Sequence, residues 1–282
     1  MESKSMTTVN VLDKGFVRLV DSMPVSNCDA AVVQAARVSY GDGTKTINDD
    51  RALIRYLLRH QHTSPFEMVE FKFHIKLPIF VARQMIRTRC ASTNEESARY
   101  SVCKDEFYVP DLERILGQSK DNKQCSGGEL DPDLKARFQR WIVDSSNSQY
   151  QIYSSFVEEG VARELVRIGL PLNIYTEWYW KIDLHNLLRF LSQRTHSHAQ
   201  YEIRVYADAM LELIRPLVPL SLQAWEDYVR GAVNLSAQEV GIVKKLLENL
   251  NSDSLRNFIS ANFPADFLSK RELTDLCHKL IN

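Results

Sequence analysis

Apolar and polar side chains alternate along residues 68–77. One side is formed by the apolar residues Val69, Phe71, Phe73 and Ile75, and the other by the polar residues Glu70, Lys72, His74 and Lys76. A period of two places each set on its own face of a sheet, so this segment predicts a half-buried antiparallel strand. Residues 9–19 contain two further apolar stretches around the turn signal Asp13 to Gly15, which predicts a strand pair or a bent strand. Residues 101–109 form another strand candidate.

Helical spacing, with apolar positions three and four residues apart, describes much of the remaining chain. The segments that predict helices are 30–39, 48–59, 79–86, 134–167 as one long helix or two, 184–191 and 201–217. Asn48 or Asp49 can cap the second of these, Pro65 ends any helix before it, and Pro78 suits the first turn of the third. The strongly aromatic run 172–181 predicts a buried packing helix.

Breaks in this pattern indicate turns, loops and a change of organisation. Gly41 to Gly43 predicts a turn, and the polar residues 119–133 predict a surface loop or an insertion. Beyond Gly231, two amphipathic helices are expected at 236–250 and 269–281, around a linker rich in Ser and Asn. We therefore expect a main domain over residues 1–230 and a helical C-terminal extension over 231–282, whose role the sequence does not indicate.

Composition places the chain among ordinary globular proteins. It has 282 residues, 44% of them hydrophobic and 25% charged, and a net charge of −1. That length can bury a sizeable core. A charge so close to zero gives no global basic field to gather nucleic acid, so any anion site must be local.

The cysteines and histidines do not form a recognisable metal or disulfide pattern. The five cysteines are scattered, which favours free thiols in a reducing cytosol. His60 and His62 are two apart, as are His196 and His198, whereas a zinc-binding helix uses a spacing of four. No metal site is expected. No secretory signal or membrane-length apolar run is visible, so we expect a cytoplasmic protein without a membrane partner.

Residues 87–100, with the sequence RTRCASTNEESARY, concentrate arginines, hydroxyl groups, an asparagine and glutamates around two small apolar residues. Arginine forks grip phosphate or carboxylate groups, and hydroxyl and amide groups fix a polar ligand. The segment predicts a site for an anionic ligand rich in hydrogen-bonding groups, such as a nucleotide. A structural alternative stays open: Glu95 and Arg99 could form an ordinary helix pair, and Ser92 or Thr93 could cap that helix.

Other segments offer further candidates. Arg163 and Arg167 lie one helical turn apart and could face one anion, or they could belong to a solvated basic helix face. Arg194 could stabilise a developing negative charge or complement a helix dipole. Cys90, beside arginines, could be a reactive thiolate, although a small buried filler is the preferred interpretation.

The order of residues in 87–100 resembles the signature of the flavin-dependent thymidylate synthases. The matching positions are Arg87, Arg89, Ser92, Asn94, Glu95, Ser97, Arg99 and Tyr100, while Thr88 stands where the family usually has histidine. The segments around Arg167 and at 187–202 resemble the family's second and third blocks, and 62–67 fits an upstream block. Departures occur at Asp183, His185 and Arg189. The resemblance covers about residues 11–228 and does not include the tail.

The resemblance implies an α+β fold with a small antiparallel sheet and long helices, like that of thymidylate-synthase-complementing proteins. It implies methylation of dUMP at C5 to dTMP, with methylenetetrahydrofolate as carbon donor, FAD as hydride carrier and NADPH as reductant. It also implies a homotetramer with sites at subunit interfaces. A non-catalytic nucleotide- or RNA-binding protein is the first alternative, and a cysteine-dependent methyltransferase using Cys90 is the second.

Site residues carry over by position. Arg194 would be catalytic, approaching the uracil ring. The resemblance assigns dUMP binding to Gln84, Arg87, Glu95, Ser97, Ala98, Arg99, Arg167 and Arg194. It assigns FAD binding to His62, Ser64, Arg87, Thr88, Arg89, Glu95, Asp183, His185, Arg189 and His198.

Overall fold

The computed structural model describes residues 7–38, 50–120, 123, 125–264 and 267–281. It divides into two units, Met1–Arg230 and Gly231–Asn282. All the described strands belong to the larger unit. The turn expected at Gly41 to Gly43 and the helix caps expected at Asn48 or Asp49 lie outside the described residues. No helix in the described part of the chain is both long and apolar enough to cross a membrane.

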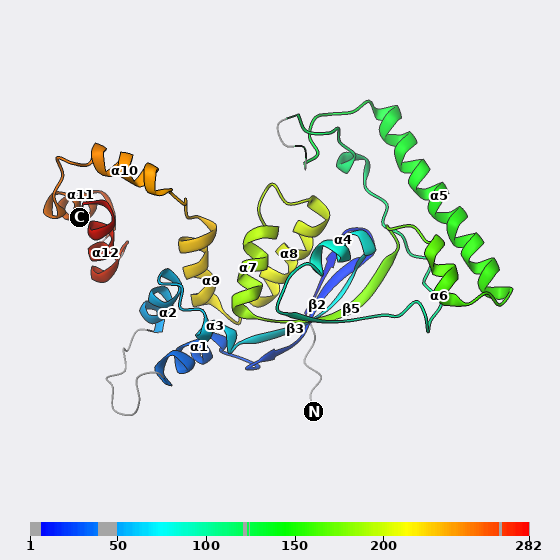
Figure 1. Ribbon diagram of the computed structural model, residues 1–282, viewed down its shortest axis with the longest axis horizontal. Coiled ribbons are helices and arrows are strands. Elements are labelled where there is room, and N and C mark those ends of the chain that lie inside the picture. Colours follow the sequence, from blue (N-terminus) through cyan, green and yellow to red (C-terminus); the bar gives the residue numbers. More distant parts are fainter. Residues whose placement is uncertain (1–6, 39–49, 121–122, 124, 265–266, 282) are drawn as a thin grey trace. The chain divides into compact units, whose positions relative to one another are not determined.

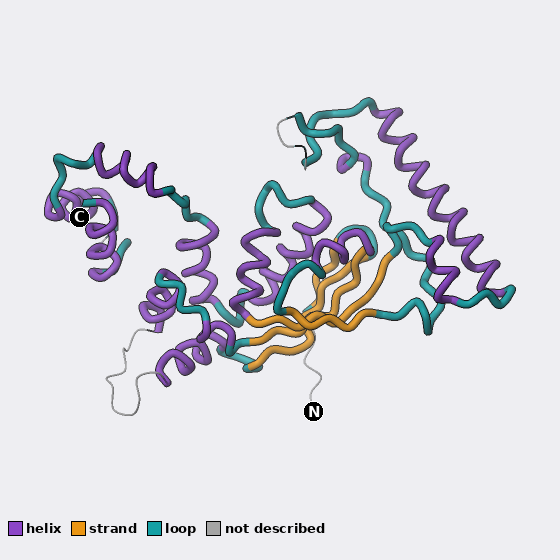
Figure 2. Tube along the Cα trace, in the orientation of Figure 1, coloured by secondary structure: helices purple, strands orange, loops and turns teal. Residues whose placement is uncertain are grey.

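The larger unit is built on one sheet (Figures 1 and 2). Its strands are antiparallel and lie in the order β1-β2-β3-β5-β4. The strands are β1 Thr8–Val11, β2 Gly15–Met23, β3 Glu70–Pro78, β4 Ala91–Glu95 and β5 Tyr175–Asp183. β3 and β5 pair from Glu70 opposite Asp183 to Pro78 opposite Tyr175. β4 pairs with β5 alone and forms one edge. The predicted strand at 68–77 and the strand pair at 9–19 are confirmed, and the architecture confirms the expected α+β class.

One face of the sheet carries the core. Phe73, Ile75 and Trp180 are completely buried on β3 and β5. Three helices pack on the sheet from this side, namely α4 Ile79–Met85, α7 Leu184–Arg194 and α8 Tyr201–Ile214 (Figure 1). Truncating a buried aromatic side chain to alanine typically costs about 3–5 kcal/mol. This layer therefore holds α4 and α7, which bear many of the candidate site residues, in fixed positions.

Gly15 joins β1 to β2 where no side chain would fit. A Cβ atom there would lie 2.7 Å from the carbonyl oxygen of Val11 and 2.8 Å from that of Lys76, and would also clash with the Tyr206 hydroxyl. That hydroxyl donates a 2.8 Å hydrogen bond to the Lys76 carbonyl. The bare glycine therefore allows α8 to be anchored directly to the middle of the sheet.

The remaining helices of the larger unit agree largely with the sequence pattern. They are α1 Cys28–Arg37, α2 Asp50–Arg59, α3 Ser64–Glu67, α5 Pro132–Glu158, α6 Arg163–Val166 and α9 Pro219–Trp225, with short turns at Leu112–Arg114, Arg167–Gly169 and Glu226–Arg230. One expectation is wrong in detail. Pro65 lies in the first turn of α3 rather than at the end of a preceding helix. The N–H groups of a first turn have no acceptor within the helix, so proline, which lacks an N–H, is tolerated there. Pro78 is the residue directly before α4.

Two predictions about the segments flanking α5 are wrong. The aromatic run 172–181 forms strand β5, not a helix, because buried Trp178, Trp180 and Ile182 alternate with polar neighbours. Residues 101–109 are not a strand beyond an isolated bridge between Phe107 and Ile174. There the backbone bonds to α5 instead: the Cys103 N–H donates to the Tyr153 hydroxyl at 3.0 Å, and the Tyr150 hydroxyl donates to the Cys103 carbonyl at 2.9 Å.

The smaller unit contains the helices α10 Ala237–Leu246, α11 Ser252–Asn262 and α12 Lys270–Leu280. Capping boxes begin α10 and α12, with Ser236 and Ser269 as N-caps. α11 occupies the segment that the sequence suggested was a linker. Its Ser and Asn content is explained by capping, since the Asn251 side chain accepts a hydrogen bond from the Ser254 N–H at 2.8 Å.

Candidate active site

The segment 87–100 is folded around strand β4. Cys90 adopts a left-handed backbone conformation with φ 62°, which turns the chain from the end of α4 into the strand. Ser92 and Thr93 are then paired opposite Lys181 and Trp180 of β5. The alternative in which these residues cap a helix is therefore wrong. β4 separates the arginines that precede it from the group that begins with Glu95 at its end and runs to Arg99.

Four arginines line one small cavity of about 180 Å³, here called the arginine cavity. Its lining residues are Arg87, Thr88, Arg89, Asn186, Arg189, Phe190, Gln193 and Arg194. The lining contains no carboxylate, and none of the four arginines forms an ion pair within the described residues. Like charges gathered without a counterion repel one another, so this cavity is suited to an anionic group.

Arg194 is the most deeply placed of these arginines. Its Nε atom is buried and has no hydrogen-bond partner in the described part of the structure. Burial lowers the pKa of its guanidinium from the ordinary value, and arginine nonetheless stays protonated in proteins. A buried donor without an acceptor is costly. Arg194, at the end of α7, is therefore prepared to bond to an acceptor that enters the cavity.

A second cavity, of about 330 Å³, lies beside the first and is here called the histidine cavity. His62, His185 and Arg189 line it together with an apolar wall that includes Phe66 and Trp225. Arg189 lines both cavities. The structure thus brings six of the predicted flavin residues around two adjoining cavities, namely Arg87, Thr88, Arg89, His62, His185 and the shared Arg189. An anionic pocket next to an apolar one suits a ligand that carries a phosphate and a flat ring.

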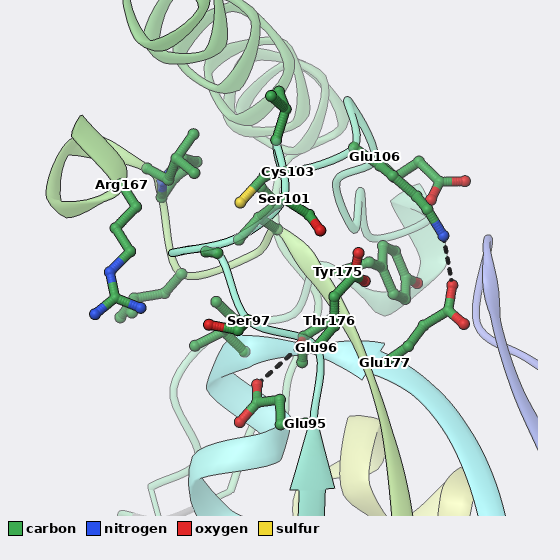
Figure 3. Close-up of a pocket in the computed structure, with 18 of the residues that line it drawn as sticks. Glu95, Glu96, Ser97, Ser101, Cys103, Glu106, Arg167, Tyr175, Thr176 and Glu177 are labelled. Atoms are coloured by element: carbon green, nitrogen blue, oxygen red, sulfur yellow. Dashed lines mark hydrogen bonds and ion pairs between the residues drawn. The ribbon is translucent and has the colours of Figure 1, made fainter. Parts of the chain in front are cut away.

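The third cavity, of about 510 Å³, lies at the end of β4 and is here called the strand-end cavity (Figure 3). Among its lining residues are the predicted nucleotide ligands Glu95, Ser97, Ala98 and Arg167. Arg167 reaches it from the short turn after α6, and Figure 3 shows its guanidinium on the same side as Ser97. Segments about 70 residues apart therefore contribute to one polar cavity.

Glu95 is held in place by a residue that the sequence did not single out. The Thr176 hydroxyl donates a 2.8 Å hydrogen bond to Glu95 Oε1 (Figure 3). Thr176 is 8% exposed and lies on β5, next to the end of β4. Its position in the misassigned run 172–181 concealed this role. The second Glu95 oxygen makes no hydrogen bond within the described residues and can accept one from a ligand.

Other charged residues in the lining of the strand-end cavity neutralise one another. Lys104 donates to Glu177 at 2.8 Å, and Lys76 donates to Glu106 at 2.8 Å. His74 Nε2 also lies 3.0 Å from Glu177. Burial by itself would raise the pKa of Glu177, but its bonds to Lys104 and His74 prevail and lower that pKa below 4.5.

Two of the predicted nucleotide residues, Gln84 and Arg99, do not line these cavities, and neither does the candidate Arg163. Arg99 is ion-paired with Glu164 at 3.3 Å, which excludes the alternative of a helix pair with Glu95. Arg163 donates to the Tyr100 carbonyl at 2.8 Å, so it secures the end of the signature and leaves the cavity to Arg167. Gln84, on α4, donates through Nε2 to Gln200 Oε1.

Three predicted flavin residues also lie outside the three cavities. Asp183 caps α7, accepting hydrogen bonds from the N–H of Asn186 at 2.9 Å and from its side chain at 2.7 Å. Since Asn186 lines the arginine cavity, Asp183 supports that wall indirectly. Ser64 is the first residue of α3, and the His198 N–H donates to His196 Nδ1 at 3.2 Å.

The structure does not favour a nucleophilic role for Cys90 or Cys103. Cys90 is exposed, so its interpretation as a small buried filler is wrong, and it is not among the lining residues of these cavities. Cys103 lines the strand-end cavity, but burial raises the pKa of its thiol above 9.0. A raised pKa lowers the thiolate fraction at neutral pH, which disfavours a nucleophilic role. Within the described residues, no group of three or more histidine, cysteine, aspartate or glutamate side chains could hold a metal ion.

Comparison with known proteins identifies the family. The family model described as thymidylate synthase complementing protein matches residues 18–220. A flavin-dependent thymidylate synthase of Wolbachia pipientis wMel is 54% identical over 241 residues, covering 86% of this chain and 84% of that protein. The chain belongs to the flavin-dependent thymidylate synthases. One from Dictyostelium discoideum is 51% identical over 241 residues, or 84% of this chain and 79% of its own length.

Solved structures agree with the flavin-dependent thymidylate synthase assignment. The chain is similar to a UMP/dUMP methylase, PolB from Streptomyces cacaoi, in a crystal structure bound with 5-Br dUMP. The TM-score is 0.70 at 35% identity, and the match covers 79% of this chain and 99% of PolB. The resemblance stated from residues 87–100 is confirmed.

Proposed function

We propose that this protein methylates dUMP at C5 to form dTMP, using methylenetetrahydrofolate as the carbon donor and FAD and NADPH for reduction. The observation that supports this most directly is the arginine cavity. Four arginines without a counterion, one of them with a buried and unbonded Nε, suit the phosphate and carbonyl acceptors of nucleotides. Family membership supplies the reaction class.

The residues around the arginine and histidine cavities fit FAD. Arg87, Arg89 and Arg189 offer guanidinium groups for its diphosphate, while the apolar wall beside His62 and His185 suits its rings. A bound flavin supplies the hydride chemistry, and the protein binds, orients and polarises. This agrees with a chain that has no glycine-rich dinucleotide fingerprint in its sequence.

We assign dUMP to residues on both sides of β4. Glu95, Ser97, Ala98 and Arg167 present carboxylate, hydroxyl, backbone and guanidinium groups in the strand-end cavity. Gln84 lies on α4, Arg87 follows just after α4, and Arg194 is the last residue of α7. Arg99 would reach the nucleotide only by exchanging its exposed ion pair with Glu164, which is weak enough to exchange.

Arg194 carries the proposed catalytic role. As carbon is added at C5, negative charge develops on the uracil ring, and a positively charged donor placed beside it lowers the barrier. Arg194 is suited to this because its guanidinium is partly desolvated and has an unbonded Nε. No cysteine attack on the ring is required, which is consistent with the raised pKa of Cys103 and the exposed position of Cys90.

The nucleotide residues of one chain are divided between separate cavities, so we propose that sites are completed where subunits of a homotetramer meet. We place the enzyme in the cytoplasm, since the free cysteines suit a reducing compartment.

The catalytic domain is residues 1–230. We propose that residues 231–282 are dispensable for catalysis, because the matched family region ends at residue 220. Deleting 231–282 should leave turnover within about two-fold, a change near the limit of ordinary surface effects.

A non-catalytic RNA-binding protein is not favoured. The arginines face a cavity of about 180 Å³ rather than an open strip, and the chain has a net charge of −1. Proteins that track single strands combine a basic groove with stacking aromatic side chains. We therefore expect no nucleic-acid partner.

The decisive experiment combines flavin absorbance of the purified protein with tritium release from dUMP labelled at C5. Methylation replaces the C5 hydrogen, so turnover should release tritium into water only when methylenetetrahydrofolate and NADPH are present. A flavin spectrum together with release is the expected result. A colourless protein that cannot be reconstituted with FAD, or a flavin-loaded one that releases no tritium, would contradict the proposal.

A further inference from the structure

The side chain of Gln84 is connected to a buried carboxylate through a second amide. Gln84 Nε2 donates to Gln200 Oε1, and Gln200 Nε2 donates to Glu202 Oε2 at 2.8 Å. Gln84 lies on α4, Gln200 directly precedes α8, and Glu202 lies in the first turn of α8. The relay, as we call these three residues, therefore links the two helices through side chains alone.

Glu202 is a firm anchor for the relay. It is 5% exposed, and Arg114 donates to both of its oxygens, at 2.9 and 3.4 Å. The Tyr108 hydroxyl donates to Oε1 at 3.2 Å. Burial, together with the adjacent Glu202 charge, raises the pKa of Tyr108, so this hydroxyl keeps its proton and remains a donor. Glu202 thus accepts every hydrogen bond that it makes here.

The direction of donation along the relay follows from this anchor. A carboxylate paired with arginine has no proton to donate, so Gln200 must turn its NH₂ group towards Glu202. The Gln200 carbonyl oxygen then faces Gln84, which must in turn offer its own NH₂ group. The orientation of both amides is fixed by chemistry and does not depend on which atom is placed as oxygen and which as nitrogen. Gln84 is left with its carbonyl oxygen directed away from Gln200.

We propose that Glu202 and Gln200 are positioning residues that fix Gln84 as a hydrogen-bond acceptor for the nucleotide. This rests on the proposed function, which places Gln84 at dUMP. The group that Gln84 binds must then be a donor, and dUMP offers two outside its phosphate, the sugar 3′-hydroxyl and the ring N3–H. Without the relay, an amide could turn over and present its NH₂ group equally well.

Binding to the full-length, FAD-loaded protein tests this with two analogues, each lacking one donor. These are 2′,3′-dideoxyuridine 5′-monophosphate and N3-methyl-dUMP, and titration calorimetry compares each with dUMP. The wild type should bind one of them about ten-fold more weakly than dUMP, as expected for one neutral hydrogen bond. Which analogue is penalised identifies the donor.

The variant Gln200→Leu should reduce that discrimination to about two-fold, since Gln84 is no longer oriented. Gln200 is exposed, so the fold tolerates the change. Gln223→Leu is the matched control: it is an exposed glutamine that accepts a bond from Arg51 at 2.9 Å and should keep the wild-type ratio. A general loss of packing would weaken dUMP and both analogues equally, leaving their ratios unchanged.

A double exchange provides a rescue that a merely structural role would not predict. The double variant Gln200→Glu with Glu202→Gln places a carboxylate opposite the Gln84 NH₂ group and an amide donor next to that carboxylate. Discrimination between dUMP and the penalised analogue should therefore return. Gln200→Glu alone places two carboxylates next to each other. The relay is overturned if the wild type discriminates against neither analogue, or if Gln200→Leu keeps the wild-type ratio. If the FAD-loaded wild type does not bind dUMP at all, the proposed function is overturned as well.

Discussion

The arginine cavity and the strand-end cavity both use residues 87–98, yet they solve the problem of charge differently. In the strand-end cavity, Lys104 and Lys76 are paired with Glu177 and Glu106. In the arginine cavity, four arginines share one lining that contains no carboxylate among the described residues. The strand-end cavity can keep its shape without a ligand, because its charges neutralise one another. The arginine cavity needs an anion to offset the repulsion between its arginines, so ligand binding and local stability should be coupled there.

The largest expected effect lies in the arginine cavity. Arg194→Ala should keep FAD but lower dTMP formation by about 10²- to 10³-fold, the usual loss when one donor to a developing charge is removed. Flavin absorbance and tritium release from C5-labelled dUMP measure the two properties separately. Arg215→Ala, which removes only an exposed pair with Glu226, is the control. Unchanged turnover in Arg194→Ala would remove the catalytic role assigned to it.

In the strand-end cavity, Arg167→Ala should act mainly on substrate binding. A charged hydrogen bond to a phosphate contributes about 1.5–3 kcal/mol, so KM for dUMP should rise about 10- to 100-fold while kcat changes less. Steady-state kinetics over a range of dUMP concentrations gives both values. Arg163→Ala is the matched control, since that guanidinium bonds to the Tyr100 carbonyl. Equal changes in KM for dUMP in Arg167→Ala and Arg163→Ala would contradict a specific role of Arg167 in dUMP binding.

Thr176→Val should have a smaller effect at the same cavity. The two side chains are similar in shape, and only the hydrogen bond to Glu95 is lost. The lost bond affects catalysis only through the orientation of Glu95, so we expect kcat/KM to fall about five-fold, on the order of 1 kcal/mol, with little change in melting temperature. Thr274→Val, which loses a bond to the Lys270 carbonyl in α12, should leave kcat/KM unchanged. A Thr176→Val enzyme with wild-type kinetics would show that Glu95 needs no such support.

The smallest effect concerns stability in acid. Because the folded pKa of Glu177 lies below its ordinary value, its contribution is present above about pH 4.5 and is lost as the pH falls through the lowered pKa. Glu177→Gln should therefore flatten the decline of melting temperature in that acidic range. Thermal melts of both proteins between pH 3 and 6 test this. Parallel curves would exclude Glu177 as a source of acid sensitivity.

The sequence predicted the fold well wherever one period was dominant. Residues 68–77 alternate cleanly and form β3, whereas in 172–181 the aromatic content suggested packing and concealed an equally regular alternation of Trp178 and Trp180 with polar neighbours. β4 could not be recognised from its sequence, ASTNE, because β5 imposes its extended conformation through pairing. α11 was missed for a related reason, since cap residues such as Asn251 resemble those of a linker.

The site was predictable in residue identity but not in grouping. Residue order in 87–100 indicated Arg87, Glu95 and Ser97, but not that β4 directs them to different cavities. The supporting residues Thr176 and Gln200 depend on tertiary contacts between segments far apart in the chain, which no local pattern encodes. Such contacts become visible only when strands and helices are packed together.

The edge position of β4 has a consequence for how this protein could be altered. An exposed edge strand offers unpaired backbone groups with which another chain can associate. Ser92, Thr93, Asn94 and Glu95 are all exposed and polar, which makes such association unfavourable. Residues suited to a ligand thus also protect the protein from aggregation. Attempts to retune specificity by placing valine or isoleucine in this strand should lower soluble yield before they change the reaction, so redesign is better directed at Arg167 or Thr176.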